Sequence, residues 1–338
     1  MPDLSQIVHG PALLPQADGT VAFHCEVAIK CNAHGRIDFV GDLSKLIRMP
    51  GTGRLPLRSV RGVIVPPFVD CHTHVPQHPI RGRFLEGVAA GSLLAGLLLA
   101  GLLRNVYPAE ARFADAAYAR DVTAAFHADT LKHGVVGGAA YVTSHAPATR
   151  SVLDALPDTW SAGLVLMDQH CPPELHITVG EAERVYRELA ASFGRRVIVT
   201  DRFAPVVTSR LRTAAAAWAA ELDLRMQTHL NEQRAEKRLV EAELYPDARS
   251  YAGVYDRDGL LGRRPILAHC VHQTPAEWDL LAARAGCVVA HCPTSNALLG
   301  SGVMPLDEIV RRRIPWVLCT DVGASPTVSL LAEMTTFL

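Results

Sequence analysis

After Gly62 the sequence alternates between short β-rich apolar runs and longer helix-compatible segments, and this alternation constrains the fold most. A strand followed by a helix and a further strand is the repeating unit of parallel α/β folds. Eight strand candidates occur, over residues 63–69, 135–142, 163–167, 196–200, 224–228, 265–268, 287–290 and 315–319. Eight repeats predict a (β/α)8 barrel, which typically takes roughly 250 residues.

Residues 1–61 follow a different pattern. Their short alternating runs, over 21–27 and 37–40, are broken by Gly and Pro, which predicts a small β domain. We therefore expect two domains, a small β domain over 1–61 and a barrel over 62–338. The apolar run over 88–103 is shorter than the roughly 20 residues of a membrane span, so a buried helix is predicted there.

Composition excludes several classes of function. The net charge of −1 gives no electrostatic basis for binding nucleic acid or an anionic membrane. The eight cysteines include no C-x-x-C pair, which argues against a zinc ribbon and a thioredoxin motif. The N-terminal residues do not have the pattern of a secretory signal, so we expect a cytoplasmic protein.

Residues that bind metals stand at the carboxyl ends of the predicted strands, where barrels of this kind carry their active sites. His72 and His74 end the first strand, and residues two apart in a strand face the same side. The later strands end in Asp201-Arg202-Phe203, His229 (with Glu232 three residues on), His269, His291 and Asp321.

The residue types predict metal-assisted hydrolysis. His72, His74, His229 and Asp321 can hold a divalent metal that lowers the pKa of a bound water toward neutrality. Glu232 can carry a proton to a leaving group, and His269 can polarise an electrophile or anchor the substrate. Two-metal barrels usually bridge their metals with a modified lysine at the end of the fourth strand. No lysine lies near that end, so one metal is predicted.

Motifs in chain order resemble those of the amidohydrolase superfamily, and specifically of its guanine deaminases. The matching segments are PPFVDCHTHVPQ, YPAEARF, TDRFAP, THLNE, LAHCVH, HCPTSNALLGSG and CTDVGA, which run from about residue 62 to 334.

The resemblance implies a role for each matched residue. His72, His74, His229 and Asp321 would bind zinc, with iron as the alternative, and Glu232 and Asp321 would move protons. Gln77 and Arg202 would hydrogen-bond a purine, Phe203 would stack on it, and His269 would contact it near the reacting carbon. Hydroxide would attack C2 of guanine and release ammonia and xanthine, a step of guanine catabolism. Family habit implies a homodimer with a small purine-like molecule as its substrate.

Several positions depart from the family pattern. Asp201 replaces a proline and places a charge next to Arg202, and the second strand lacks the usual threonines. The Trp expected before YPAE is also missing. These changes leave an aminohydrolase or chlorohydrolase of a pterin, 8-oxoguanine or a triazine as alternatives.

The chain stops seventeen residues after Asp321, with the eighth helix barely begun. The C-terminal segment that completes the family's β-sandwich with the N-terminal strands is absent, so we expect a truncated chain with an incomplete last helix. Strand edges in residues 1–60 would then be exposed. A catalytically silent, truncated homologue with a structural or interaction role is the alternative from a different class.

Overall fold

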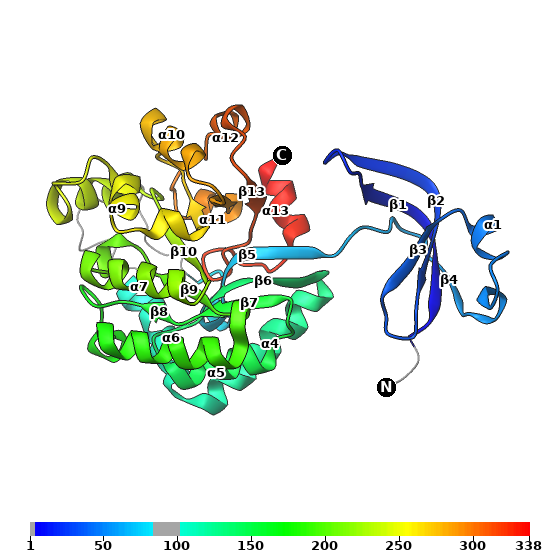
Figure 1. Ribbon diagram of the computed structural model, residues 1–338, viewed down its shortest axis with the longest axis horizontal. Helices are drawn as coiled ribbons and strands as arrows, with labels where there is room; N and C mark the ends of the chain where they lie inside the picture. Colours follow the sequence, from blue (N-terminus) through cyan, green and yellow to red (C-terminus); the bar gives the residue numbers. More distant parts are fainter. Residues whose placement is uncertain (1–3, 84–101) are drawn as a thin grey trace. The chain divides into compact units, whose positions relative to one another are not determined.

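The computed structural model describes residues 4–83 and 102–338, and the chain divides into two compact units, Met1–Pro67 and Phe68–Leu338 (Figure 1). Each unit has its own sheet structure and its own buried apolar residues. The two units are therefore described separately.

The first unit is a four-stranded sheet in the order β3-β2-β1-β4. Strands β1 and β2 are antiparallel, and β1 and β4 are parallel. Buried Ile7 and Ala28 pack with Leu46 of the short helix α1. The element bounds are β1 Gln6–Pro15, β2 Val21–Cys31, β3 Ile37–Gly41, α1 Leu43–Leu46 and β4 Leu57–Ser59.

The second unit contains parallel strands in two sheets, with the orders β5-β6-β7 and β13-β12-β11-β10-β9-β8. A single parallel bridge, Ala162 to Val197, joins the strand β7 to the segment before β9. The bounds are β5 Phe68–His74, β6 Val135–Tyr141, β7 Trp160–Gly163, β8 Val165–Leu166, β9 Ile198–Asp201, β10 Arg225–Leu230, β11 Ile266–His269, β12 Val288–His291 and β13 Trp316–Leu318.

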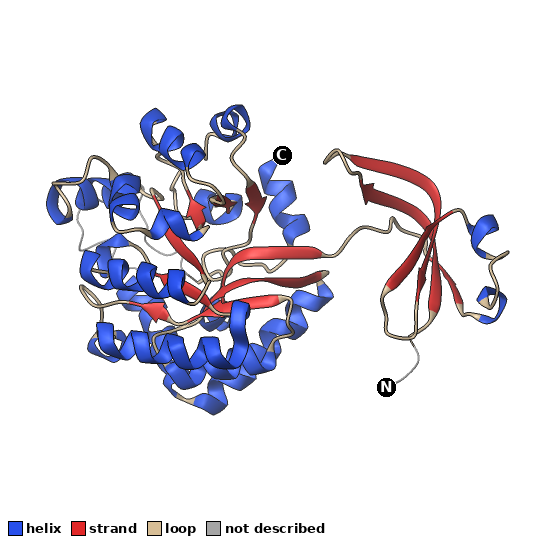
Figure 2. Cartoon of the chain, in the orientation of Figure 1, coloured by secondary structure: helices blue, strands red, loops and turns tan. Residues whose placement is uncertain are grey.

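Helices lie between these strands along the chain and surround them in space (Figure 2). Three of the long helices begin at a Thr or Asp whose side chain accepts from backbone N–H groups of the first turn, which stabilises their starts. The bounds are α3 Tyr107–Ala111, α4 Ala116–Lys132, α5 Ala146–Ala155, α6 Val179–Phe193, α7 Ser209–Glu221, α8 Arg234–Arg238, α9 Tyr251–Arg257, α10 Pro275–Ala283, α11 Pro293–Leu298, α12 Leu306–Arg312 and α13 Leu330–Phe337.

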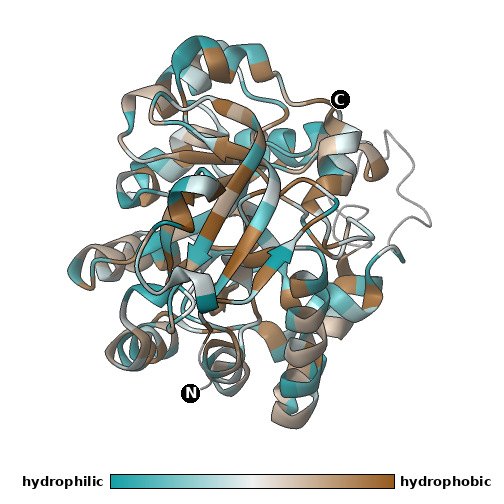
Figure 3. Cartoon of the chain, turned by 90° about the vertical axis from the view of Figure 1, so that its right-hand side faces the viewer, coloured by the Kyte–Doolittle hydropathy of each residue, from teal (hydrophilic) through white to brown (hydrophobic). Residues whose placement is uncertain are grey.

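The core of the second unit lies between the strands and these helices. Figure 3 shows helices that carry both hydrophilic and hydrophobic residues, as expected for helices that cover a sheet on one face. The largest buried side chains include Trp160, Trp278, Phe113 and Phe126. This packing leaves polar residues to gather at the carboxyl ends of the strands.

The first predicted strand of this unit was wrong in its position. The prediction placed it over residues 63–69, whereas β5 covers Phe68–His74, so both histidines lie within the strand. Pro66 and Pro67 explain the shift, because proline lacks the N–H that a ladder requires. His72 and His74 still face one side, because they lie two residues apart within β5.

The buried helix predicted over 88–103 lies outside the described residues, apart from its last two positions. Leu102–Val106 forms a π-helical turn. Within the described ranges, every helix is too short or too polar to cross a membrane.

Gly163 of β7 lies in close contact with β9, and this contact generates a stability prediction. A Cβ at this position would lie 2.0 Å from the Ile198 carbonyl oxygen and 2.0 Å from the Thr200 hydroxyl. We expect Gly163→Ala to lower the free energy of unfolding by about 2 kcal/mol or more, since β7 must move away from β9. Urea denaturation measures this.

Gly180 provides the matched control, because a Cβ there meets nothing within 4 Å. Gly180→Ala should leave stability unchanged or raise it by up to about 1 kcal/mol. Equal effects of the two substitutions would contradict the close packing of these strands.

Candidate active site

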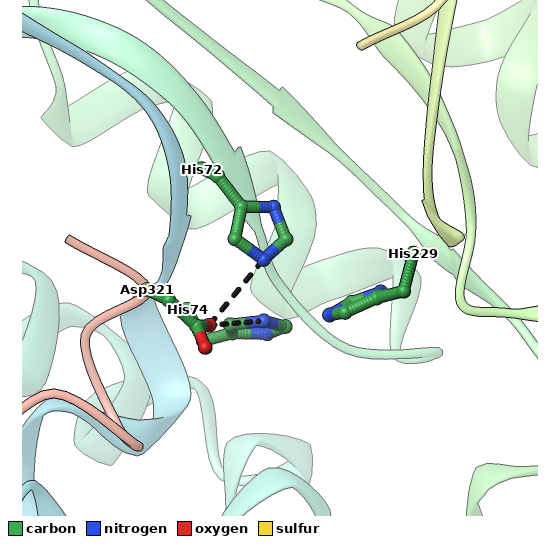
Figure 4. A group of neighbouring side chains, drawn as sticks. All are labelled: His72, His74, His229 and Asp321. Atoms are coloured by element: carbon green, nitrogen blue, oxygen red, sulfur yellow. Dashed lines mark ion pairs between the residues drawn. The ribbon is translucent and has the colours of Figure 1, made fainter. Parts of the chain in front are cut away.

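Four side chains from three parts of the second unit converge on one point. His72 and His74 come from β5, His229 from β10, and Asp321 from the segment after β13. One ligand atom of each lies within 4.8 Å of the others (Figure 4). The four residues that the sequence singled out as metal ligands therefore lie together.

A hydrogen bond fixes the tautomer of His229. Its Nδ1 lies 2.7 Å from the backbone carbonyl oxygen of Arg202. A carbonyl oxygen can only accept, so Nδ1 carries the proton and Nε2 keeps its lone pair. Metal-bound histidines are typically oriented by such a bond.

Burial keeps the three imidazoles neutral. It lowers the pKa of His72 to about 4, lowers the pKa of His74, and holds the pKa of His229 well below the ordinary value. Both ring nitrogens of His72 and Nδ1 of His74 are buried and have no hydrogen-bond partner among the described residues. Buried polar atoms of this kind need a partner, and neutral imidazole nitrogens suit a divalent metal.

Asp321 supplies the negative charge of the group. Burial opposes its ionisation, but contacts with His72 and His74 hold the pKa of its carboxyl well below the ordinary value. Its Oδ1 lies 3.3 Å from Nε2 of each histidine, and the Ser295 hydroxyl donates to Oδ2 at 2.6 Å. Three neutral nitrogens with one carboxylate form a ligand set that zinc accepts.

Asp70 ties β5 to the segment directly after β13, and no role was assigned to it from the sequence. Its Oδ1 accepts from the backbone N–H groups of His72 and Thr320, each at 3.2 Å, and its Oδ2 accepts from the Thr320 hydroxyl. The Asp321 N–H also donates to the His72 carbonyl oxygen at 2.9 Å. These bonds bring Asp321 to the histidines. The signal was the Asp two positions before His72.

His269 and Glu232 lie beside the four candidate metal ligands. The rings of His269 and His229 stack with centroids 5.3 Å apart, and His269 Nε2 lies 3.7 Å from a Glu232 carboxylate oxygen. Burial acts to lower the pKa of His269, but the Glu232 and Asp321 carboxylates raise it above the ordinary value. Its Nδ1 donates to the Asn296 side-chain oxygen at 2.9 Å.

Burial also raises the pKa of Glu232, whose Oε1 accepts from the Ser301 hydroxyl at 3.2 Å. A raised carboxyl pKa suits a group that must hold and release a proton near neutral pH. The backbone is left-handed at His269 (φ 70°) and Asp321 (φ 52°). Strained positions of this kind cluster at functional sites.

The predicted substrate contacts lie next to this centre. Phe203 is 7% exposed, and its ring centroid lies 6.3 Å from that of His229. Gln77 lies in a short 3-10 helix, Val75–Ile80, directly after β5. Gln77 and Arg202 both hydrogen-bond to Glu110 of α3, a residue to which the sequence analysis gave no role.

Asp201 does not place its charge beside the Arg202 guanidinium, contrary to the sequence expectation. Its carboxylate binds the Arg212 guanidinium at 2.7 Å and accepts from the Thr228 hydroxyl at 3.0 Å. Arg212 and Asp201 are both fully buried. Neighbouring side chains in a strand face opposite sides, so the Asp201 charge is neutralised by Arg212 on the side away from the Arg202 guanidinium.

Tyr141, at the end of β6, is another residue near the site to which no role was assigned from the sequence. Its ring lies 5.0 Å from His72 and 4.6 Å from His74, measured between centroids. Its buried hydroxyl has no hydrogen-bond partner within the described part of the chain. Its position at the end of a predicted strand was the sequence feature that could have marked it as a site residue.

Comparison with known proteins agrees with this arrangement. Residues 63–338 match the amidohydrolase family. The chain is 37% identical over 283 residues to the probable guanine deaminase of Deinococcus radiodurans, covering 80% of this chain and 61% of that protein. It is 32% identical over 310 residues to the guanine deaminase of Escherichia coli, covering 89% of this chain and 67% of the relative. This chain thus spans about three fifths to two thirds of their lengths.

Solved structures of guanine deaminases are similar to this chain. The guanine deaminase of C. acetobutylicum with bound guanine in its active site superposes with a TM-score of 0.86 at 26% identity, covering 98% of this chain and 78% of that one. The E. coli guanine deaminase gives a TM-score of 0.85 at 28% identity, covering 98% of this chain and 77% of that one. The fold is therefore similar to that of guanine deaminases.

The geometry predicts which histidine the metal requires. We expect His229→Ala to weaken zinc binding by about 100-fold or more, because it removes a ligand and not merely a hydrogen bond to one. His291→Ala is the matched control, since His291 is also buried at a strand end but lies outside the four-residue group. Titration against a chelator of known affinity measures both. Equal losses in the two variants would contradict the assigned ligand set.

Proposed function

This chain belongs to the amidohydrolase family, and from that membership we propose that it is a guanine aminohydrolase that releases ammonia and xanthine. The observation that carries the proposal is the joint position of the four candidate ligands, Glu232 and His269 at one point. The guanine deaminases among its relatives support guanine as the substrate.

We propose a (β/α)8 barrel for the second unit. Two contacts support closure of the two parallel sheets into one ring. One is the parallel bridge between β7 and the segment before β9, and the other is the backbone hydrogen bond from Asp321 to His72. A barrel directs the carboxyl ends of all its strands to one face, which accounts for the convergence of the ligands. Our proposed domains remain the small β domain over 1–61, as part of a composite β-sandwich, and the barrel over 62–338.

We propose zinc as the metal, with His72, His74, His229 and Asp321 as its ligands. Bound there, zinc would lower the pKa of a water toward neutrality and so supply a nucleophile. Nitrogen and carboxylate ligands fit zinc, and iron is the alternative. A homodimer and a cytoplasmic location remain further proposals.

The chain's own residues handle the protons. Glu232 has a raised pKa and an oxygen close to His269, so it can take a proton from water and deliver it to the leaving amino group. Asp321 remains ionised and can accept a proton as well as bind the metal. His269 donates through Nδ1 to Asn296 and keeps Nε2 without a hydrogen-bond partner in the described part of the chain, so Nε2 would be the atom that contacts the substrate.

Binding of the purine falls to three residues. Phe203 offers a ring beside His229, and Gln77 and Arg202 offer hydrogen-bonding groups. An aromatic face with convergent polar groups is typical of sites for flat heterocycles.

Ammonia release tests this proposal. The zinc-loaded chain should release ammonia from guanine, and should do so faster than from a pterin, 8-oxoguanine or a triazine. Glu232→Gln should lower kcat by about 10²- to 10⁴-fold with its zinc content retained. Glu221→Gln, an exposed substitution on the outside of α7, is the control and should match the wild type.

The outcomes separate the reaction from the substrate. Turnover of another ring but not of guanine would contradict the substrate assignment. A purified chain that binds neither zinc nor iron would contradict metal-dependent hydrolysis altogether.

A further inference from the structure

Glu110 joins the two polar residues proposed to bind the substrate. It lies in α3 and is fully buried. Its Oε1 accepts from Gln77 Nε2 at 3.1 Å and from Arg202 Nη1 at 2.6 Å. These partners lie 33 and 92 positions away in the sequence. One carboxylate oxygen therefore holds two side chains that the chain brings together from distant segments.

The contact determines which way the Gln77 amide faces. A carboxylate oxygen accepts hydrogen bonds, so the amide nitrogen of Gln77 must be the end that faces Glu110. The amide oxygen is then left as an acceptor. It lies against Gly323, where an added Cβ would be only 2.2 Å from it. Gly323 has φ 126°, a conformation that other residues rarely adopt.

The same contact fixes Arg202. Its guanidinium is held by Glu110 and lies 5.4 Å from the centroid of the Tyr107 ring, while its backbone carbonyl accepts from His229 Nδ1. A guanidinium has several N–H donors, and one of them goes to Glu110. The backbone of Arg202 thus orients a candidate metal ligand, while its guanidinium is tied to Glu110.

Stability is a poor explanation for this ion pair. Glu110 and Arg202 are both buried, and burying two charges costs about as much as their attraction returns. Burial also raises the pKa of Glu110, which the Arg202 charge opposes. Oε2 of Glu110 has no partner among the described residues, so the arrangement is not optimised as a structural link.

We propose that Glu110 is a positioning residue that sets the hydrogen-bonding polarity of the substrate pocket, with Gln77 Oε1 as acceptor and Arg202 as donor. The pocket would then select a heterocycle edge that carries an N–H next to an acceptor, as the edges of an oxopurine do. This inference rests on the function proposed above and names the residue that enforces its selectivity.

Steady-state kinetics of Glu110→Gln test the inference. This nearly isosteric change removes the charge that orders both partners. The KM for guanine should rise about 10- to 100-fold, while kcat should stay within about threefold, because uniform binding is lost and the reacting groups are untouched. Zinc content and thermal stability are measured in parallel. The exposed Glu221→Gln serves as the charge-removing control.

A double-mutant cycle separates positioning from a general structural role. In a Gln77→Ala/Arg202→Gln background, Glu110→Gln should lower kcat/KM by less than about twofold, since the residues through which it acts are gone. Gly323→Ala changes no charge, but its added Cβ would displace the Gln77 amide oxygen, which is the end of the side chain away from Glu110. It should raise KM as Glu110→Gln does.

Three kinetic results would overturn the inference. They are a kcat loss with unchanged KM, an effect of Glu110→Gln that is equally large in the Gln77/Arg202 background, or a Gly323→Ala variant with wild-type KM. Crystal structures of the wild type and Glu110→Gln without substrate provide a test that does not depend on guanine turnover. Arg202 and Gln77 should reorient in the variant, and unchanged positions would refute the inference even if the substrate is another ring.

Discussion

The hydrogen bonds of Asp70 are the constraint on which the rest of the site depends. The buried Asp70 carboxylate accepts hydrogen bonds from the backbone of His72 in β5 and from Thr320, directly before Asp321. Burial raises its pKa to about 7 despite these bonds, so its position is costly as well as central. These hydrogen bonds hold Asp321, which follows β13, beside the histidines of β5 with which it would share a metal. The ends of the domain and the centre of the site are therefore held by the same interaction.

Arg202 links the proposed metal centre to the proposed substrate pocket. Its carbonyl oxygen orients His229, and its guanidinium pairs with Glu110, which also holds Gln77. Burial keeps the imidazoles neutral, while two carboxylates raise the pKa of His269. The neighbours of each buried imidazole thus decide whether its pKa is lowered, as in His72, or raised, as in His269.

The sequence predicted the strand–helix alternation and the residues at the strand ends, because apolar periodicity and chain order are local properties. It misplaced the first strand by overlooking Pro66 and Pro67, whose effect on a ladder is also local. It could not assign Glu110 or Asp70, since their roles exist only through partners far along the chain. Asp201 was expected beside Arg202, but its partner Arg212 becomes visible only once α7 packs against β9.

Anomalous diffraction from crystals of the zinc-loaded chain, collected on both sides of the zinc absorption edge, is the sharpest test of the proposed metal site. We expect one strong peak at about 2.0–2.2 Å from nitrogen atoms of His72, His74 and His229 and from a carboxylate oxygen of Asp321. A peak elsewhere in the chain, or two peaks bridged by a carboxylate, would contradict it.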